Sequence, residues 1–84
     1  MGVMVRKANT YEYEYMKREE VWESDVTTFD YCYENEETFL LEKGKGRITY
    51  DGKTVCFEAG DICVASKGLC CHWEVLEPIK KYLH

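Results

Sequence analysis

This sequence of 84 residues is short of proline, of clustered positive charge and of long apolar runs. Its single proline leaves most of the chain free to form uninterrupted strands. The net charge is −5 and there is no basic cluster beyond Lys80-Lys81, so nucleic acid is not an expected partner. No apolar run approaches the roughly 20 residues that span a bilayer, and the N-terminus lacks the pattern of a signal peptide. We therefore expect a cytoplasmic protein that has no membrane partner.

Cysteine is present, but not in a pattern that predicts cross-links. The five cysteines are an odd number, and no two of them have the C-x-x-C spacing, which argues against a full disulfide framework and against a zinc ribbon. In a reducing compartment we expect most of them to be free thiols. Cys56 and Cys63 in particular should behave as small buried hydrophobes.

Hydrophobic and aromatic residues are abundant and favour an all-β fold. They include seven Tyr, three Phe and two Trp, which suit a half-buried pleated surface. A chain of this length forms one domain, here residues 1–84, whose core is thin, so a homodimer is expected. Residues 1–20 should form an N-terminal strand and a connector, and residues 21–84 a barrel. Val3 to Lys7 is either an edge strand or an arm lent to a partner.

Short apolar runs between glycines predict consecutive antiparallel strands from Glu37 to Trp73. Asp51-Gly52 is a residue pair favoured in a two-residue type I′ turn. A hairpin with this loop pairs the residues on its two sides in order: Tyr50 with Lys53, Thr49 with Thr54, and Ile48 with Val55.

Alternation along two other predicted strands separates inner from outer side chains. Phe29, Tyr31 and Tyr33 share one face of the first strand. In the last long strand the apolar side chains fall on one face and His72 with Glu74 on the other, and Pro78 should end the strand. The apolar set is Leu69, Cys71, Trp73 and Val75.

Glu37 is the charged residue that this pattern places among apolar neighbours. It shares a face with Phe39 and Leu41. A carboxylate in the interior is costly without a partner. Glu37 should therefore be paired, metal-bound, protonated or close to a solvent-filled mouth.

Several motifs resemble the cupin superfamily, specifically the small single-domain cupins related to the cupin domain of ureidoglycine aminohydrolases and to the ethanolamine-utilisation cupin. The resemblance covers residues 21 to 83. It is carried by Trp22-Glu23, Phe29-Asp30-Tyr31, Glu37 with Leu41-Glu42-Lys43-Gly44, Gly60-Asp61, Lys67-Gly68-Leu69 with Cys71 and Trp73, and Pro78-Ile79-Lys80-Lys81. It implies an RmlC-like, jelly-roll-like antiparallel β-barrel.

The resemblance also implies a metal site that this chain has largely lost. The first cupin motif has two His before the position of Glu37. Depending on the gap, Tyr31 and Tyr33 or Asp30 and Cys32 stand there, and the shared aromatic face favours the tyrosines. In the second motif Cys71 replaces the His ligand. A barrel mouth lined by Tyr31, Tyr33, Glu37, Cys71 and Trp73 is then expected to bind a small molecule that has an apolar or cationic part, with no metal cofactor.

Three other functions stay open at this point. The chain could be an enzyme resembling its aminohydrolase relatives, with Glu37 as general acid or base. It could be a structural or regulatory dimer whose aromatic side chains fill the barrel. A divalent transition metal at Glu37 and Cys71 is the third alternative, weakened because zinc sites are usually built from at least three protein ligands. Thiol catalysis at Cys71 is disfavoured, since a nearby carboxylate raises a thiol pKa.

Overall fold

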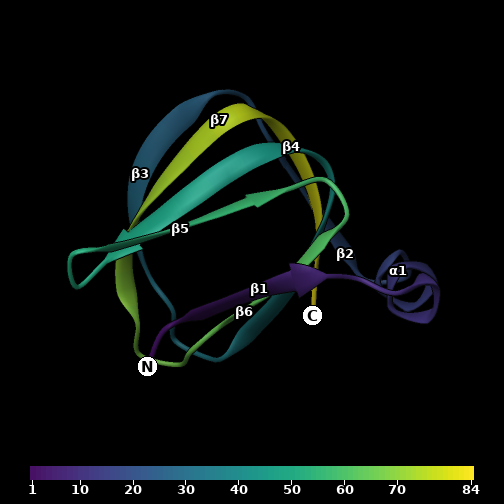
Figure 1. The fold of residues 1–84 in the computed structure, drawn as a ribbon, viewed down its shortest axis with the longest axis horizontal. Helices are drawn as coiled ribbons and strands as arrows, with labels where there is room; N and C mark the ends of the chain where they lie inside the picture. Colours follow the sequence, from purple (N-terminus) through teal and green to yellow (C-terminus); the bar gives the residue numbers. More distant parts are fainter.

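Two long antiparallel strands, β4 (Glu37–Tyr50) and β7 (Cys70–Leu83), form the centre of the molecule. A computed structural model describes residues 1–84. Four shorter strands pair with these two, a fifth, β1, pairs with β6, and one helix follows β1 (Figure 1). The shorter elements are β1 (Val3–Lys7), α1 (Thr10–Met16), β2 (Glu20–Ser24), β3 (Thr27–Cys32), β5 (Lys53–Glu58) and β6 (Asp61–Ala65).

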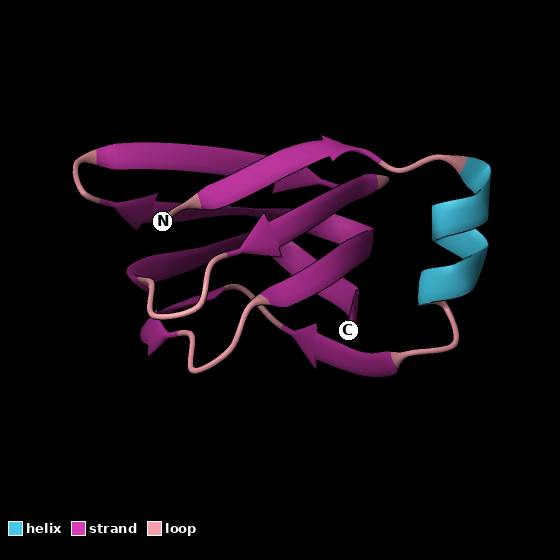
Figure 2. Cartoon of the chain, turned by 90° about the horizontal axis from the view of Figure 1, so that it is seen from below, coloured by secondary structure: helices cyan, strands magenta, loops and turns pink.

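The two long strands bend, and each half belongs to a different layer. The first half of β4 pairs with β6 and with the last residues of β7, while its second half pairs with β5 and mainly with the first half of β7. β3 pairs with the first half of β7 and β2 with the last part. The result is one curved seven-stranded antiparallel sheet that folds over its own core without closing (Figures 1 and 2). The all-β cupin prediction is confirmed.

The bend lies where β4 and β7 lose their regular register between Leu41 and Gly46. Gly44 has φ +95°, and a Cβ on it would lie 2.2 Å from the carbonyl oxygen of Pro78. Glycine is therefore required at this crossing. The prediction that Pro78 ends its strand is wrong, since β7 continues to Leu83. Pro78 lies where the pairing of β7 with β4 is irregular, so no hydrogen bond of the sheet needs the backbone N–H that proline lacks.

The Asp51-Gly52 hairpin has the predicted register, with all three expected residue pairs in place. Asp51 has φ +46° and Gly52 φ +72°, as a type I′ turn requires. Thr49 and Thr54 share a hydrogen bond of 3.1 Å between their hydroxyl oxygens on the outer face. Local sequence alone sets this element.

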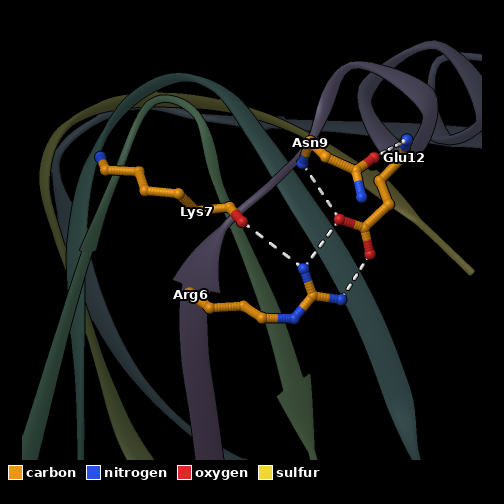
Figure 3. Close-up of polar contacts among 4 residues, drawn as sticks. All are labelled: Arg6, Lys7, Asn9 and Glu12. Carbon is orange, nitrogen blue, oxygen red and sulfur yellow. Dashed lines mark hydrogen bonds and ion pairs between the residues drawn. The ribbon is translucent and has the colours of Figure 1, made fainter.

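The segment expected as a connector contains α1. The side chain of Asn9 accepts a hydrogen bond from the Glu12 N–H at 2.8 Å, and the Asn9 N–H donates to Glu12 Oε1 at 3.0 Å, which completes a capping box (Figure 3). Arg6 of β1 forms a bidentate ion pair with Glu12. Met16 of the helix packs on the outer face of the sheet, in a small cluster with Leu40, Ile62 and Tyr82.

The main core lies inside the fold of the sheet and contains 13 buried residues, among them Phe39, Leu41 and Trp73. β1 is an edge strand that pairs with β6 of its own chain, which decides between the two predictions for it.

Cys63 is buried as expected, whereas Cys56 is exposed because it lies on the outer face of β5. Three of the five cysteines are free thiols, which agrees with the expectation that most of them are free, while Cys32 and Cys70 form a disulfide between β3 and β7 that the sequence did not indicate. The helix α1 has neither the length nor the apolar character needed to cross a membrane.

Candidate functional site

The most unusual side chain in the interior is a lysine. Lys81, on the last part of β7, is only 6% exposed. It reaches the inner face because β7 keeps its alternation on both sides of the bend, so that Trp73, Ile79 and Lys81 all point inward. Sequence reasoning had assigned Lys81 no role.

Three aromatic rings and one carboxylate surround the Lys81 amine. Its Nζ lies 4.3 Å from the ring centroid of Phe39, 4.4 Å from that of Trp73 and 4.6 Å from that of Trp22. The Oε2 atom of Glu37 lies 3.6 Å away. Each ring face attracts a cation, and such contacts are stronger when water is excluded. Glu37 is therefore paired, one of the four states predicted for it.

The charge state of Lys81 depends on opposing effects. Burial lowers its pKa to about 8, because the cation loses its hydration. Glu37 acts in the opposite direction and favours the charged form. At neutral pH the amine is mainly an ammonium ion with an appreciable unprotonated fraction.

A pocket of about 150 Å³ opens onto this pair. Tyr33 is buried in its wall, and its hydroxyl accepts a 3.0 Å hydrogen bond from the indole N–H of Trp73. Burial raises the pKa of the Tyr33 hydroxyl, so this group stays neutral. Tyr31 is 44% exposed at the mouth, edge-to-face on Tyr33. The full lining is Trp22, Phe29, Tyr31, Tyr33, Glu37, Trp73, Lys81 and Leu83.

Four of the five predicted site residues line this pocket, and Cys71 does not. The Cys71 thiol is buried behind the tyrosines, where it donates a hydrogen bond to the Tyr31 carbonyl oxygen at 3.4 Å. Burial raises its pKa, which makes it a poor nucleophile at neutral pH. His72 lies on the outer face, as predicted, with its Nδ1 2.8 Å from Asp30.

A second hollow is larger but chemically plainer. It has a volume of about 480 Å³ and lies over the bend between β2 and β7, with a single hydrophobic residue in its lining. Its charged side chains are solvated, and none of them is buried. The smaller aromatic pocket is the candidate site because it combines apolar walls with a buried lysine that is paired with a half-buried carboxylate.

Comparison with known proteins agrees with this fold. The family model for the EutQ-like cupin domain matches residues 14–82. This chain belongs to the EutQ-like cupin family. A DUF861 family protein from Thermotoga maritima is 34% identical, with a TM-score of 0.92, over 98% of this chain and 97% of that one. A search of curated proteins found no match.

Two EutQ proteins share the fold of this cupin at lower identity. The protein from Clostridium difficile is 22% identical and that from Salmonella typhimurium, an ethanolamine utilization protein, is 15% identical. Both have a TM-score of 0.70 over 96% of this chain. The match covers 65% and 66% of their own lengths.

The metal ion common in cupins does not fit the side chains at this site. No group of three or more His, Cys, Asp or Glu side chains is placed to hold one. Tyr31 and Tyr33 line the pocket beside Glu37, and Glu37 faces the Lys81 amine at 3.6 Å. A cation beside Glu37 would repel a second cation. Lys81 thus holds the positive charge at this place in the fold.

Proposed function

We propose that this cupin binds a small organic molecule in the aromatic pocket without the help of a metal ion. The single observation that carries the proposal is the Lys81–Glu37 pair at the base of a pocket with aromatic walls. An engineered cavity of about the same volume binds benzene, so the ligand would be of that size.

The charges at the site narrow the chemical class of the ligand. The sequence favoured a ligand with an apolar or cationic part, but the cation position between the rings is occupied by Lys81 itself. A ligand that enters would place its apolar body against Phe29 and Trp22 and an acceptor oxygen toward Lys81. We therefore propose a ligand with a carboxylate or a carbonyl group.

A thermal-shift screen of small acids and amines tests this function. Benzoate should raise the melting temperature of the wild type and benzylamine should not, because only the acid complements Lys81. Glu37→Gln should bind benzoate more tightly, since it removes the charge that neutralises Lys81, and Lys81→Met should not bind it. Lys80→Met is the control, because Lys80 lies outside the pocket and pairs with Glu42. The proposal fails if no acid or amine stabilises either the wild type or Glu37→Gln.

A catalytic role for Glu37 is the second candidate function, and the Glu37–Lys81 contact favours it. A carboxylate beside an amine can accept and return a proton during a reaction on a bound molecule. Turnover that is lost in Glu37→Gln while ligand binding persists would support this role. A protein whose pocket serves only for packing would show neither binding nor turnover.

We also propose that the protein is a homodimer. Its thin core and exposed apolar side chains, including Met4, Val21 and Val26, support association of two copies. Sedimentation analysis measures the mass directly. A single species at the 9.9 kDa of one chain would contradict the proposal.

A further inference from the structure

We infer that Lys81 is a nucleophilic amine that forms a reversible imine with a small aldehyde or ketone held in the aromatic pocket. This inference rests on the proposed function and names a reaction at the same site. It follows from the position of the amine, because Lys81 lines the pocket and is otherwise enclosed by the rings of Trp22, Phe39 and Trp73. A carbonyl carbon held in the pocket would approach the Nζ atom from the side that the three rings leave free.

The surroundings of Lys81 suit both the reactant and the product. An amine attacks a carbonyl only when it is unprotonated, and desolvation in an aromatic site favours that form. The protonated imine is again a cation on the same nitrogen. The ring faces and the Glu37 carboxylate that stabilise the ammonium ion would therefore stabilise the iminium ion too.

Few other ionisable groups face the Lys81 amine. Glu37 of β4 is its ion-pair partner, and the thiols of Cys63 on β6 and Cys71 on β7 also act on its charge. Burial raises the pKa of Cys63 to about 12 and raises that of Cys71, so both thiols are neutral near pH 7. Glu37 is left as the acid–base group next to the amine.

The reaction balances without any oxidant or reductant. The Nζ lone pair of the neutral Lys81 amine forms a bond to the carbonyl carbon, and the carbonyl oxygen takes up a proton from solvent water to give a carbinolamine. Glu37 accepts a proton from Nζ and returns it to the carbinolamine hydroxyl. The carbon–oxygen bond breaks, water leaves, and a carbon–nitrogen double bond forms. Addition of water reverses every step and releases the carbonyl compound.

Lys80 provides a matched comparison on the same strand. It immediately precedes Lys81 in the chain, lies outside the pocket, and pairs with Glu42 at 3.1 Å. That ion pair raises the pKa of Lys80, whereas burial lowers the pKa of Lys81. Near pH 7.5 a larger fraction of Lys81 than of Lys80 should therefore be unprotonated.

Reductive trapping tests the inference. The folded protein is incubated with benzaldehyde and cyanoborohydride near pH 7.5, and peptide mass spectrometry measures the modification of each lysine. We expect Lys81 to be modified at least tenfold faster than Lys80, and this preference to disappear in urea, where both side chains are solvated. Lys81→Met should lose the selective adduct and Lys80→Met should keep it. Glu37→Gln should slow the trapping at Lys81.

The outcomes separate this inference from the proposed function. Equal modification of Lys80 and Lys81 in the folded wild type would overturn imine formation, and this measurement needs no variant to fold. If benzoate stabilises the wild type while benzaldehyde leaves no selective adduct, only the covalent inference fails. If benzoate does not bind and Lys81 is nevertheless modified selectively, the imine survives and the preference for acids is wrong.

Discussion

Lys81 places an amine where most proteins of this size would place an apolar side chain. Burying an ammonium ion is costly unless it is paired, and a desolvated cation–π contact contributes about 2 kcal/mol. Three rings and one carboxylate together offset much of that cost. The pKa of Lys81 is nevertheless lowered, because the folded protein stabilises the ammonium form less than water does.

The first prediction concerns the stability of the fold as pH rises. The pKa of Lys81 is about 8 in the folded state and near 10.4 in an unfolded chain, so between these values the unfolded state binds more protons. The free energy of unfolding contributed by Lys81 should then increase with pH, by about 2 kcal/mol from about pH 7 to about pH 9.5. Urea denaturation of the wild type and of Lys81→Met, compared at each pH, measures it.

The comparison with Lys81→Met is needed because other groups act oppositely. Burial raises the pKa values of Tyr33, Cys63 and Cys71, so their contributions decrease as pH rises. Desolvation, the largest cause of these shifts, is present in both proteins, so the contributions of these groups largely cancel in the difference. A difference that stays constant from pH 7 to about pH 9.5 would show that Lys81 has an ordinary pKa.

Some residues of the site could be predicted from sequence and one could not. Alternation and the family motifs pointed to Tyr31, Tyr33, Glu37 and Trp73, all of which line the pocket. Lys81 lies an even number of residues after Trp73 and therefore on the same face of β7, but the expectation that the strand ends at Pro78 left Lys81 outside it. Side-chain alternation extends only as far as the strand that carries it.

At the scale of elements, the bend in β4 depends on one glycine. Gly44→Ala should destabilise the protein by about 3 kcal/mol or more, because it adds a left-handed residue and a Cβ that meets the Pro78 carbonyl oxygen at 2.2 Å. Gly52→Ala is the matched control, since Gly52 also has positive φ but has open space around it. It should cost only about 1 kcal/mol. Equal losses in urea denaturation would contradict the role of the close contact.

The start of α1 gives a second prediction at this scale. Asn9→Ala removes the side-chain acceptor for the Glu12 N–H and should cost about 1 kcal/mol of unfolding free energy. Asn9→Asp keeps an acceptor and places a negative charge at the helix N-terminus, so it should be close to neutral. Chemical denaturation of both variants provides the measurement. A loss in Asn9→Asp equal to that in Asn9→Ala would rule out the capping contribution.

An element formed by contacts between neighbouring residues is easier to predict from sequence than one that depends on residues far away in the chain. The Asp51-Gly52 hairpin is fixed by adjacent residues and was predicted with its register. The tyrosines of α1 alternate in a way that also suits a strand, and the helix is decided by the Asn9–Glu12 capping box and by the packing of Met16 on the sheet. The length of β7 depends on the distant β4, whose irregular register accommodates Pro78.

At the scale of the whole molecule, one covalent bond joins residues that are far apart in the chain. Cys32 and Cys70 are separated by 38 positions and are direct partners in the pairing of β3 with β7. Neither the odd number of cysteines nor their spacing indicated this bond, because it results from strand register. The bond holds the end of β3, which carries Tyr31, against the strand that carries Trp73.

The last prediction is that this disulfide stabilises the fold. Closing a loop of this length removes unfolded-state entropy and contributes about 2 to 4 kcal/mol. Unfolded, unreduced protein should react with iodoacetamide at Cys56, Cys63 and Cys71 only, and reduction should expose the other two cysteines. The double substitution Cys32→Ser with Cys70→Ser should lower the unfolding free energy by the same amount as reduction of the wild type.

Cys56→Ser is the control for this experiment, because Cys56 is a free, exposed thiol. Its stability should match that of the wild type and should fall equally on reduction. Alkylation of all five cysteines in the unreduced protein would refute the cross-link. If the disulfide is confirmed, its loss should also weaken benzoate binding, because the Tyr31 wall of the pocket is then held only by backbone hydrogen bonds and side-chain packing.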